Sequence, residues 1–288
     1  MCVVANPLDH VDHREGQVRS RDGRTLFEQS WASPEARAAV VLVHGYGEHS
    51  GRYATAARFL AEAGCAVQAF DLRGHGRSEG TRCFVSHFRD YLRDVDAALA
   101  VAAELWPRLP VFLMGHSLGG LICALFVLET ERELDGLVLS APSIKLGADF
   151  NPVKSKMAEL LGRPFPTLPT ARFRAESLSR DPEVVRAYRE DELVFHGRTP
   201  ARTASEINRA MRFVRRTMHD IVLPLLMMHG SSDRVTDPDG SRLFYDSVRS
   251  KDKSFETYDG LYHEIMNEPE KTRVLTDVAR WLDSHVRQ

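Results

Sequence analysis

The chain has 288 residues, of which 43% are hydrophobic and 27% charged, a composition that excludes disordered and collagen-like proteins. At about 150 residues per domain, this length allows one large domain with an insertion, or two domains. The 38 lysine and arginine residues nearly balance the 40 acidic residues, so a net charge of −2 leaves no overall field to attract nucleic acid. Neither the cysteines nor the N-terminal residues indicate an exported protein. Cys2, Cys65, Cys83 and Cys123 form no C-x-x-C pair, residues 1–10 show no export signal and no apolar run could span a bilayer, so we expect a cytoplasmic protein.

Apolar strands alternate with amphipathic helices through the first half of the chain, which is typical of parallel strands joined by crossover helices. The expected elements there are, in order, a strand at 40–43, a helix at 53–63, a strand at 66–70, a helix at 88–105, a strand at 111–114, a helix at 118–129 and a strand at 137–140. Strands at 225–228 and 254–258 and a helix at 269–286 follow later. The pattern predicts an α/β fold with a mostly parallel sheet and flanking helices.

The alternation stops between residues 144 and 220, where six prolines interrupt short helical patterns. This stretch holds 15 basic and 10 acidic residues, so it is the basic part of an otherwise acidic chain. We expect it to be an inserted helical cap, and we expect residues 1–143 and 221–288 to form one core.

The segment Gly115-His116-Ser117-Leu118-Gly119 matches G-x-S-x-G between an expected strand and an expected helix. A serine on such a sharp turn presents its hydroxyl above the sheet, and glycines on either side leave room where a Cβ would obstruct the bend. Ser117 is therefore the candidate nucleophile. We expect the adjacent His116 to point away from it, as a packing residue.

A serine hydroxyl becomes an effective nucleophile when a histidine accepts its proton and a carboxylate orients that histidine. Asp233 follows the expected strand at 225–228, and His263 follows the strand at 254–258. Their order after Ser117 matches the serine, acid, histidine order of α/β-hydrolases. Asp237 and Asp239 share the loop with Asp233 and are weaker alternatives, because they lie further from the strand end.

Acyl transfer also requires N–H donors directed at the developing oxyanion. The first helical residue after the nucleophile, Leu118, supplies one such N–H. The second is expected from Tyr46, in the segment His44-Gly45-Tyr46-Gly47 after the strand at 40–43. We interpret His229, which precedes a glycine at a strand end, as structural.

Four segments together resemble the monoacylglycerol lipases and their lysophospholipase-like relatives. They are 44–53 (HGYGEHSGRY), 71–80 (DLRGHGRSEG), 115–120 (GHSLGG) and 229–235 (HGSSDRV). The resemblance implies an α/β-hydrolase fold with an eight-stranded sheet, a helical cap, no metal and no cofactor. It assigns Ser117, Asp233 and His263 to a catalytic triad.

The same resemblance assigns the N–H groups of Tyr46 and Leu118 to the oxyanion hole. It places Glu48 and Arg52 beside the alcohol-binding end of the pocket, although an ion pair that holds the loop explains these two residues equally well. Some relatives carry a second histidine three positions after the catalytic one, where this chain has Met266. This difference weakens the case for glycerol as the alcohol.

We therefore expect a serine hydrolase that cleaves lipid esters, with monoacylglycerol as the first candidate substrate. The alternatives are a lysophospholipase, a general carboxylesterase, a peptidase of the same fold and an inactive binding module. Ser117 argues against dehalogenases and epoxide hydrolases of this fold, which use an aspartate. We expect no obligate protein partner.

The cap is expected to supply an acyl tunnel and, as an alternative to purely solvated helix faces, a transient contact with anionic membrane surfaces that would make the protein peripheral. The expected tunnel residues are Phe150, Met157, Leu160, Leu161, Phe165 and Leu168.

Overall fold

The computed structural model describes residues 11–172 and 174–286, so Cys2 and the N-terminal segment assessed above for an export signal lie outside the described residues. Eight strands form one sheet in the order β1-β2-β4-β3-β5-β6-β7-β8. The strands are β1 (Asp12–Arg19), β2 (Thr25–Ala32), β3 (Ala38–Val43), β4 (Cys65–Phe70), β5 (Val111–His116), β6 (Gly136–Ser140), β7 (Leu225–Gly230) and β8 (Lys253–Tyr258). The pairs β1–β2 and β2–β4 are antiparallel. The other neighbouring strands of the sheet, from β4 and β3 through to β8, all pair parallel. The α/β-hydrolase expectation is confirmed.

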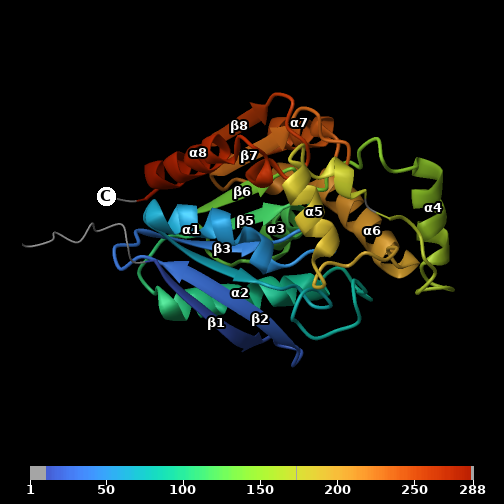
Figure 1. Ribbon diagram of the computed structural model, residues 1–288, viewed down its shortest axis with the longest axis horizontal. Helices are drawn as coiled ribbons and strands as arrows, with labels where there is room; N and C mark the ends of the chain where they lie inside the picture. Colours follow the sequence, from blue (N-terminus) through green and yellow to red (C-terminus); the bar gives the residue numbers. More distant parts are fainter. Residues whose placement is uncertain (1–10, 173, 287–288) are drawn as a thin grey trace, which may run out of the picture.

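Helices cover both faces of the sheet (Figure 1). One core cluster joins the sheet to α2 (Asp90–Leu105), α3 (Leu118–Glu129) and α7 (Pro238–Ser247), and the other joins it to α1 (Ala54–Glu62) and α8 (Lys271–Ser284). The central strands β3 and β4 are buried along their whole length, as the continuous apolar sequence of β3 and the mainly apolar sequence of β4 predict. The three cysteines in the described part of the chain are buried free thiols.

Between β6 and β7 the chain leaves the sheet and forms α4 (Pro152–Leu161), α5 (Pro182–Glu190) and α6 (Ala201–Thr217). In this segment the described residues form no strand, only two isolated bridges. Figure 1 shows α4 at one end of the molecule, with α6 between it and the sheet. No described helix combines the length and the hydropathy that crossing a membrane requires.

The sheet begins with two strands, β1 and β2, that the sequence pattern did not predict. β1, with the sequence DHREGQVR, is largely exposed and carries few apolar residues. It pairs with β2 over its full length at the edge of the sheet. An edge strand with a solvated face lacks the buried apolar run by which the inner strands were recognised.

Candidate active site

Ser117 lies on the sharp turn between β5 and α3, with φ 54° and ψ −116°. This left-handed backbone conformation is strained for a residue with a side chain, and such strain persists where the surroundings enforce it. The neighbouring glycine provides the space: a Cβ on Gly119 would lie 2.1 Å from the carbonyl oxygen of Val43 at the end of β3. The close approach of α3 to β3 therefore requires glycine at position 119 and holds Ser117 at the carboxyl end of the sheet.

The structure brings together the three residues predicted as a triad. The Ser117 Oγ lies 2.9 Å from Nε2 of His263, and Nδ1 of His263 lies 2.7 Å from Oδ2 of Asp233. All three side chains are buried. Close approach of the loops explains Gly230, because a Cβ there would lie 2.4 Å from two carbonyl oxygens of the loop that carries His263.

Asp233 is held by an almost complete set of donors. Its Oδ1 accepts hydrogen bonds from the backbone N–H groups of Val235 at 2.7 Å and Thr236 at 3.0 Å. Its Oδ2 accepts from the Thr236 hydroxyl at 2.8 Å and from His263. The alternative acids are engaged elsewhere: Asp237 caps α7 and pairs with a lysine, and the side chain of Asp239 is mostly exposed.

Burial and charge set the protonation states of this pair. Burial alone would lower the pKa of His263, but the adjacent Asp233 carboxylate outweighs it and raises that pKa above its ordinary value. Burial would raise the pKa of Asp233, and the charges and hydrogen bonds of His263 and His229 reverse this and lower it. Asp233 thus stays ionised while His263 accepts and returns a proton.

Two further histidines, His229 and His116, lie beside the triad. Nε2 of His229 lies 3.0 Å from Oδ2 of Asp233, and its Nδ1 lies 2.7 Å from the Ser241 hydroxyl, so this fully buried residue supports the acid. His116 was expected to point away from the site, and this prediction is wrong: its ring centroid lies 4.7 Å from that of His263. Burial lowers the pKa of His116 to about 4, which keeps it neutral beside His263.

The loop after β3 carries one candidate oxyanion donor, Tyr46, and the start of α3 carries the other, Leu118. Ser117, Leu118 and Tyr46 line the same cavity. Leu118 is the first residue of α3, where backbone N–H groups have no partner within the helix and the helix dipole favours negative charge. His44 fixes the start of the loop, because its Nε2 accepts a 3.0 Å hydrogen bond from the N–H of Leu72 and its Nδ1 lies 2.7 Å from the carbonyl oxygen of Gly45.

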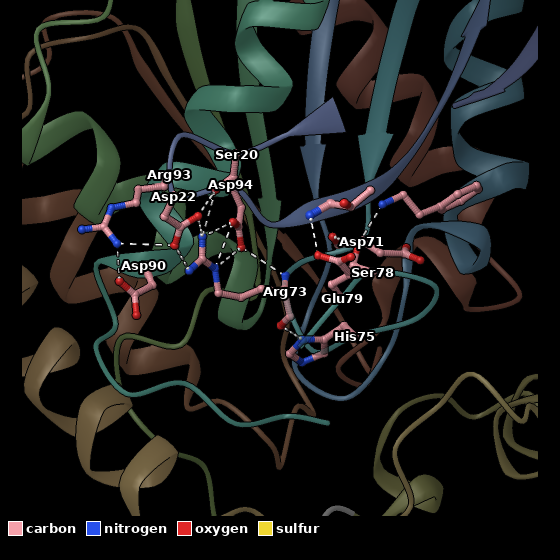
Figure 2. A network of polar contacts seen from close by, with 12 residues as sticks. Ser20, Asp22, Asp71, Arg73, His75, Ser78, Glu79, Asp90, Arg93 and Asp94 are labelled. Atoms are coloured by element: carbon pink, nitrogen blue, oxygen red, sulfur yellow. Dashed lines mark hydrogen bonds and ion pairs between the residues drawn. The ribbon is translucent and has the colours of Figure 1, made fainter. Parts of the chain in front are cut away.

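Leu72 belongs to a segment that a buried ion pair anchors (Figure 2). The guanidinium of Arg73 contacts the carboxylate of Asp94 on α2 at 2.6 Å and that of Asp22 at 2.7 Å. Asp94 is fully buried. In the same segment, the ring of His75 packs 5.8 Å from that of Tyr46, so the ion pair and the oxyanion loop are linked through a few packed residues.

Glu48 and Arg52 form an ion pair that ties the same loop to the loop of His263. Glu48 accepts hydrogen bonds from the N–H of Gly45 at 2.6 Å and from Arg52 at 2.6 Å. Arg52 also makes a bidentate contact with Glu264 at 2.6 and 2.8 Å. These contacts fit an ion pair that holds the loop in place. Glu48 and Glu264 also line a small pocket beside Ser117 and His263. Met266 is buried in the core beside α8.

A larger cavity of about 220 Å³ opens at Ser117 and extends beneath the segment between β6 and β7. Its apolar lining includes Leu146, Phe150, Ala158 and Ile207. Of the six predicted tunnel residues, Phe150 lines this cavity, but the prediction is wrong for four: Met157 and Leu160 on α4, and Phe165 and Leu168 in the segment after α4, are exposed. A helical pattern shows that a helix has an apolar face but not which way that face points.

Comparisons with known proteins show the family of this chain. Residues 34–270 match the family described as serine aminopeptidase, S33. The chain is 38% identical to a monoacylglycerol lipase of Mycolicibacterium smegmatis over 91% of its length and 94% of that protein, and 34% identical to the human monoglyceride lipase over 91% and 88%. The crystal structure of the Paleococcus ferrophilus monoacylglycerol lipase superposes with a TM-score of 0.82 at 34% identity, covering 90% of this chain and 99% of that one. This chain belongs to the serine aminopeptidase S33 family of α/β-hydrolases, together with these monoacylglycerol lipases.

Proposed function

We propose that the chain is a serine ester hydrolase that cleaves monoacylglycerol into a fatty acid and glycerol. The observation that carries the proposal is the continuous relay from the Ser117 hydroxyl through His263 to Asp233 at the mouth of a partly apolar cavity. Its similarity to monoacylglycerol lipases over nine-tenths of the chain supports the same substrate class.

In the proposed mechanism, Ser117 attacks the ester carbonyl while His263 takes its proton, and Asp233 stabilises the resulting imidazolium. The N–H groups of Tyr46 and Leu118 bind the oxyanion of the tetrahedral intermediate. His263 then protonates the leaving alcohol, which yields an acyl-serine. A water molecule, activated by His263 in turn, releases the fatty acid and restores Ser117.

The two pockets at Ser117 are assigned by the proton that His263 must deliver. The leaving oxygen has to face His263, so we place the alcohol on the side of Ser117 where the small pocket lies. This pocket has a volume of only about 10 Å³, enough for about one water molecule, so the residues around it must move to admit the alcohol. The larger cavity, which Ser117 and Leu118 line from the other side, then takes the acyl chain. In this assignment residues 144–220 act as a cap that covers the acyl chain.

The family description raises peptidase activity as the second candidate. An aminopeptidase needs an unpaired acidic group to hold the substrate's amino terminus. The two carboxylates beside the triad, Glu48 and Glu264, both pair with Arg52 at contacts of 2.6 to 2.8 Å, so neither is unpaired, although the three groups together keep one net negative charge. This pairing favours the ester hydrolase over the aminopeptidase.

We also propose that the outer side of the cap contacts lipid surfaces. Leu160 is 72% exposed and Phe165 is 58% exposed, and the remaining exposed apolar residues of this region are Val153, Met157 and Leu168. A variant that combines Leu160→Ser and Phe165→Ser should bind phospholipid vesicles on the order of tenfold more weakly. The equally exposed Val222 lies outside α4–α6, so Val222→Ser is the matched control. Equal vesicle binding by both variants would contradict this contact.

The substrate assignment is tested with monoacylglycerols of increasing chain length beside p-nitrophenyl esters and an amino-acid p-nitroanilide. We expect the highest kcat/KM on a monoacylglycerol, and less than about 1% residual turnover in Ser117→Ala. Faster turnover of the anilide would favour the peptidase. Undiminished ester turnover by Ser117→Ala would contradict the proposed mechanism.

A further inference from the structure

The segment that contains α5 is hydrogen-bonded to both loops that carry catalytic groups. Before α5, the carbonyl oxygen of Leu178 accepts a 2.8 Å hydrogen bond from the N–H of Glu264, the residue after His263. After α5, the N–H of Phe195 donates a 2.7 Å hydrogen bond to the carbonyl oxygen of Gly47 in the oxyanion loop, which follows β3. The backbone of the cap is therefore joined directly to the active site.

The contact at Gly47 holds the oxyanion loop on one side of its proposed donor, Tyr46. The N–H of Gly45, on the other side, donates to the Glu48 carboxylate at 2.6 Å. Gly47 has a φ of 77°, in the left-handed region that glycine enters freely. A glycine on each side of Tyr46 gives the loop little stiffness of its own, so its shape depends on these two hydrogen bonds.

Asp191, the residue after α5, shapes the turn that brings Phe195 to the loop. Its Oδ1 accepts a 2.9 Å hydrogen bond from the N–H of Leu193, and its Oδ2 lies 2.8 Å from Nε2 of His49. Nδ1 of His49 accepts from the N–H of Gly51 at 3.2 Å, so in the neutral ring Nε2 carries the proton and donates it to Asp191. One carboxylate thus joins the cap to the end of the oxyanion loop.

This pair of side chains is sheltered from solvent. The side chain of His49 is 9% exposed and that of Asp191 is 27% exposed. Burial would raise the pKa of Asp191, but hydrogen bonds from His49 and from the N–H of Leu193 lower it, so the carboxylate stays ionised. Hydrogen bonds to an ionised acceptor are stronger than those between neutral groups, and limited exposure to water preserves that strength.

We propose that Asp191 is a positioning residue that holds the oxyanion loop in its catalytic shape from the side of the cap. This inference rests on the proposed ester hydrolase function, and it makes residues 191–195 part of the machinery that stabilises the oxyanion. Asp191 acts through His49 and Phe195. Its loss should therefore weaken binding of the transition state more than binding of the substrate.

Asp191→Asn tests this role because asparagine keeps the shape of the side chain but has only one acceptor oxygen. If that oxygen faces the N–H of Leu193, the NH₂ group meets the N–H of His49. If the amide turns over, the NH₂ group meets the N–H of Leu193. Either orientation sets two donors against each other and should loosen the turn. His49→Ala removes one of these donors, so Asp191→Asn should have little further effect when it is added to His49→Ala.

The assay is the hydrolysis of monodecanoylglycerol, beside inhibition by a decyl trifluoromethyl ketone, whose adduct with Ser117 carries an oxyanion. Losing an oxyanion donor completely costs about 10²–10³-fold in kcat, so a loosened loop should cost roughly tenfold. We expect this loss in Asp191→Asn and in His49→Ala, with KM within about threefold of the wild type and ketone binding weakened by roughly the same factor as kcat. The double variant should lie within about threefold of His49→Ala, because both changes break the same contact.

Glu190→Gln is the matched control, because Glu190 is the neighbouring residue, is exposed and loses the same charge. It should stay within about twofold of wild-type kcat. Thermal unfolding checks that each variant is folded. Equal losses in Asp191→Asn and Glu190→Gln would overturn the proposal. So would a rise in KM with unchanged kcat, unchanged binding of the ketone, or multiplying losses in the double variant.

Failure of the proposed function would be a separate result. If the wild type hydrolysed no ester, the rate at which a fluorophosphonate labels Ser117 would still test the inference, because its phosphoryl oxygen enters the same oxyanion hole. We expect labelling to be roughly tenfold slower in Asp191→Asn than in the wild type. Equal labelling rates in the two proteins would overturn the role of Asp191.

Discussion

Asp233→Asn separates the charge of the acid from its shape. The Asn side chain has the same size, and its oxygen can still accept from the N–H groups of Val235 and Thr236. Its NH₂ group must then face His263 at the position where the carboxylate accepted a hydrogen bond at 2.7 Å. Nδ1 of His263 must then accept a hydrogen bond from this NH₂ group, so the proton of the neutral ring lies on Nε2 instead.

A histidine protonated at Nε2 cannot accept the Ser117 proton across the 2.9 Å contact. The loss expected for such a wrong tautomer is roughly 10⁴-fold in kcat, or about 5.5 kcal/mol of barrier. Removing the carboxylate also removes the influence that raises the pKa of His263, while burial still lowers it. Any residual activity should therefore depend on pH with an acidic limb displaced to lower pH.

The assay is the steady-state hydrolysis of monodecanoylglycerol from pH 5 to 9, with thermal unfolding as the check on the fold. Asp237→Asn is the matched control. Asp237 shares the loop, caps α7 and pairs with Lys145, and asparagine is an equally good N-cap. We expect the control to stay within a few-fold of wild-type kcat. More than about a tenth of wild-type activity in a folded Asp233→Asn protein would refute the reasoning.

Three further predictions concern the scaffold and the pH dependence. Gly119→Ala places a Cβ 2.1 Å from the Val43 carbonyl oxygen, so esterase activity should fall at least tenfold and Tm should drop. Unchanged activity and Tm would show that the close packing of α3 on β3 does not require glycine. Arg73→Met leaves the buried Asp94 without its cation, so the free energy of unfolding should fall by about 3–5 kcal/mol and Tm by roughly 10 °C. Arg77→Met is the control, because Arg77 lies in the same segment and is half exposed, and it should shift Tm by a few degrees at most. In the wild type, kcat/KM requires neutral His263, so it should rise with pH through a pKa above about 6.5; a limb below that value would contradict the influence of Asp233.

The sequence predicted the triad because each member follows a strand, and the carboxyl ends of parallel strands meet at one edge of the sheet. The turn at Ser117 and the loops with Asp233 and His263 could therefore be placed before any distance was known. The inner strands were equally predictable, since strands buried on both faces are continuously apolar.

What the sequence did not predict depends on direction in space. His116 is the last residue of β5, and its ring packs against that of His263, a contact between distant segments that the local pattern does not specify. The support of Asp233 by His229 arises because both ends of one short loop fold back together. The outward face of α4 follows from how α4 packs on α6, a contact between segments that no local pattern specifies.

Covalent capture tests the central claim most directly. The protein is treated with a fluorophosphonate, its remaining esterase activity is followed, and the labelled peptide is identified by mass spectrometry. The account predicts one adduct, on Ser117, formed in proportion to the loss of activity and absent from Ser117→Ala. Full esterase activity in a protein completely labelled at Ser117, or inactivation through an adduct at another residue, would contradict it.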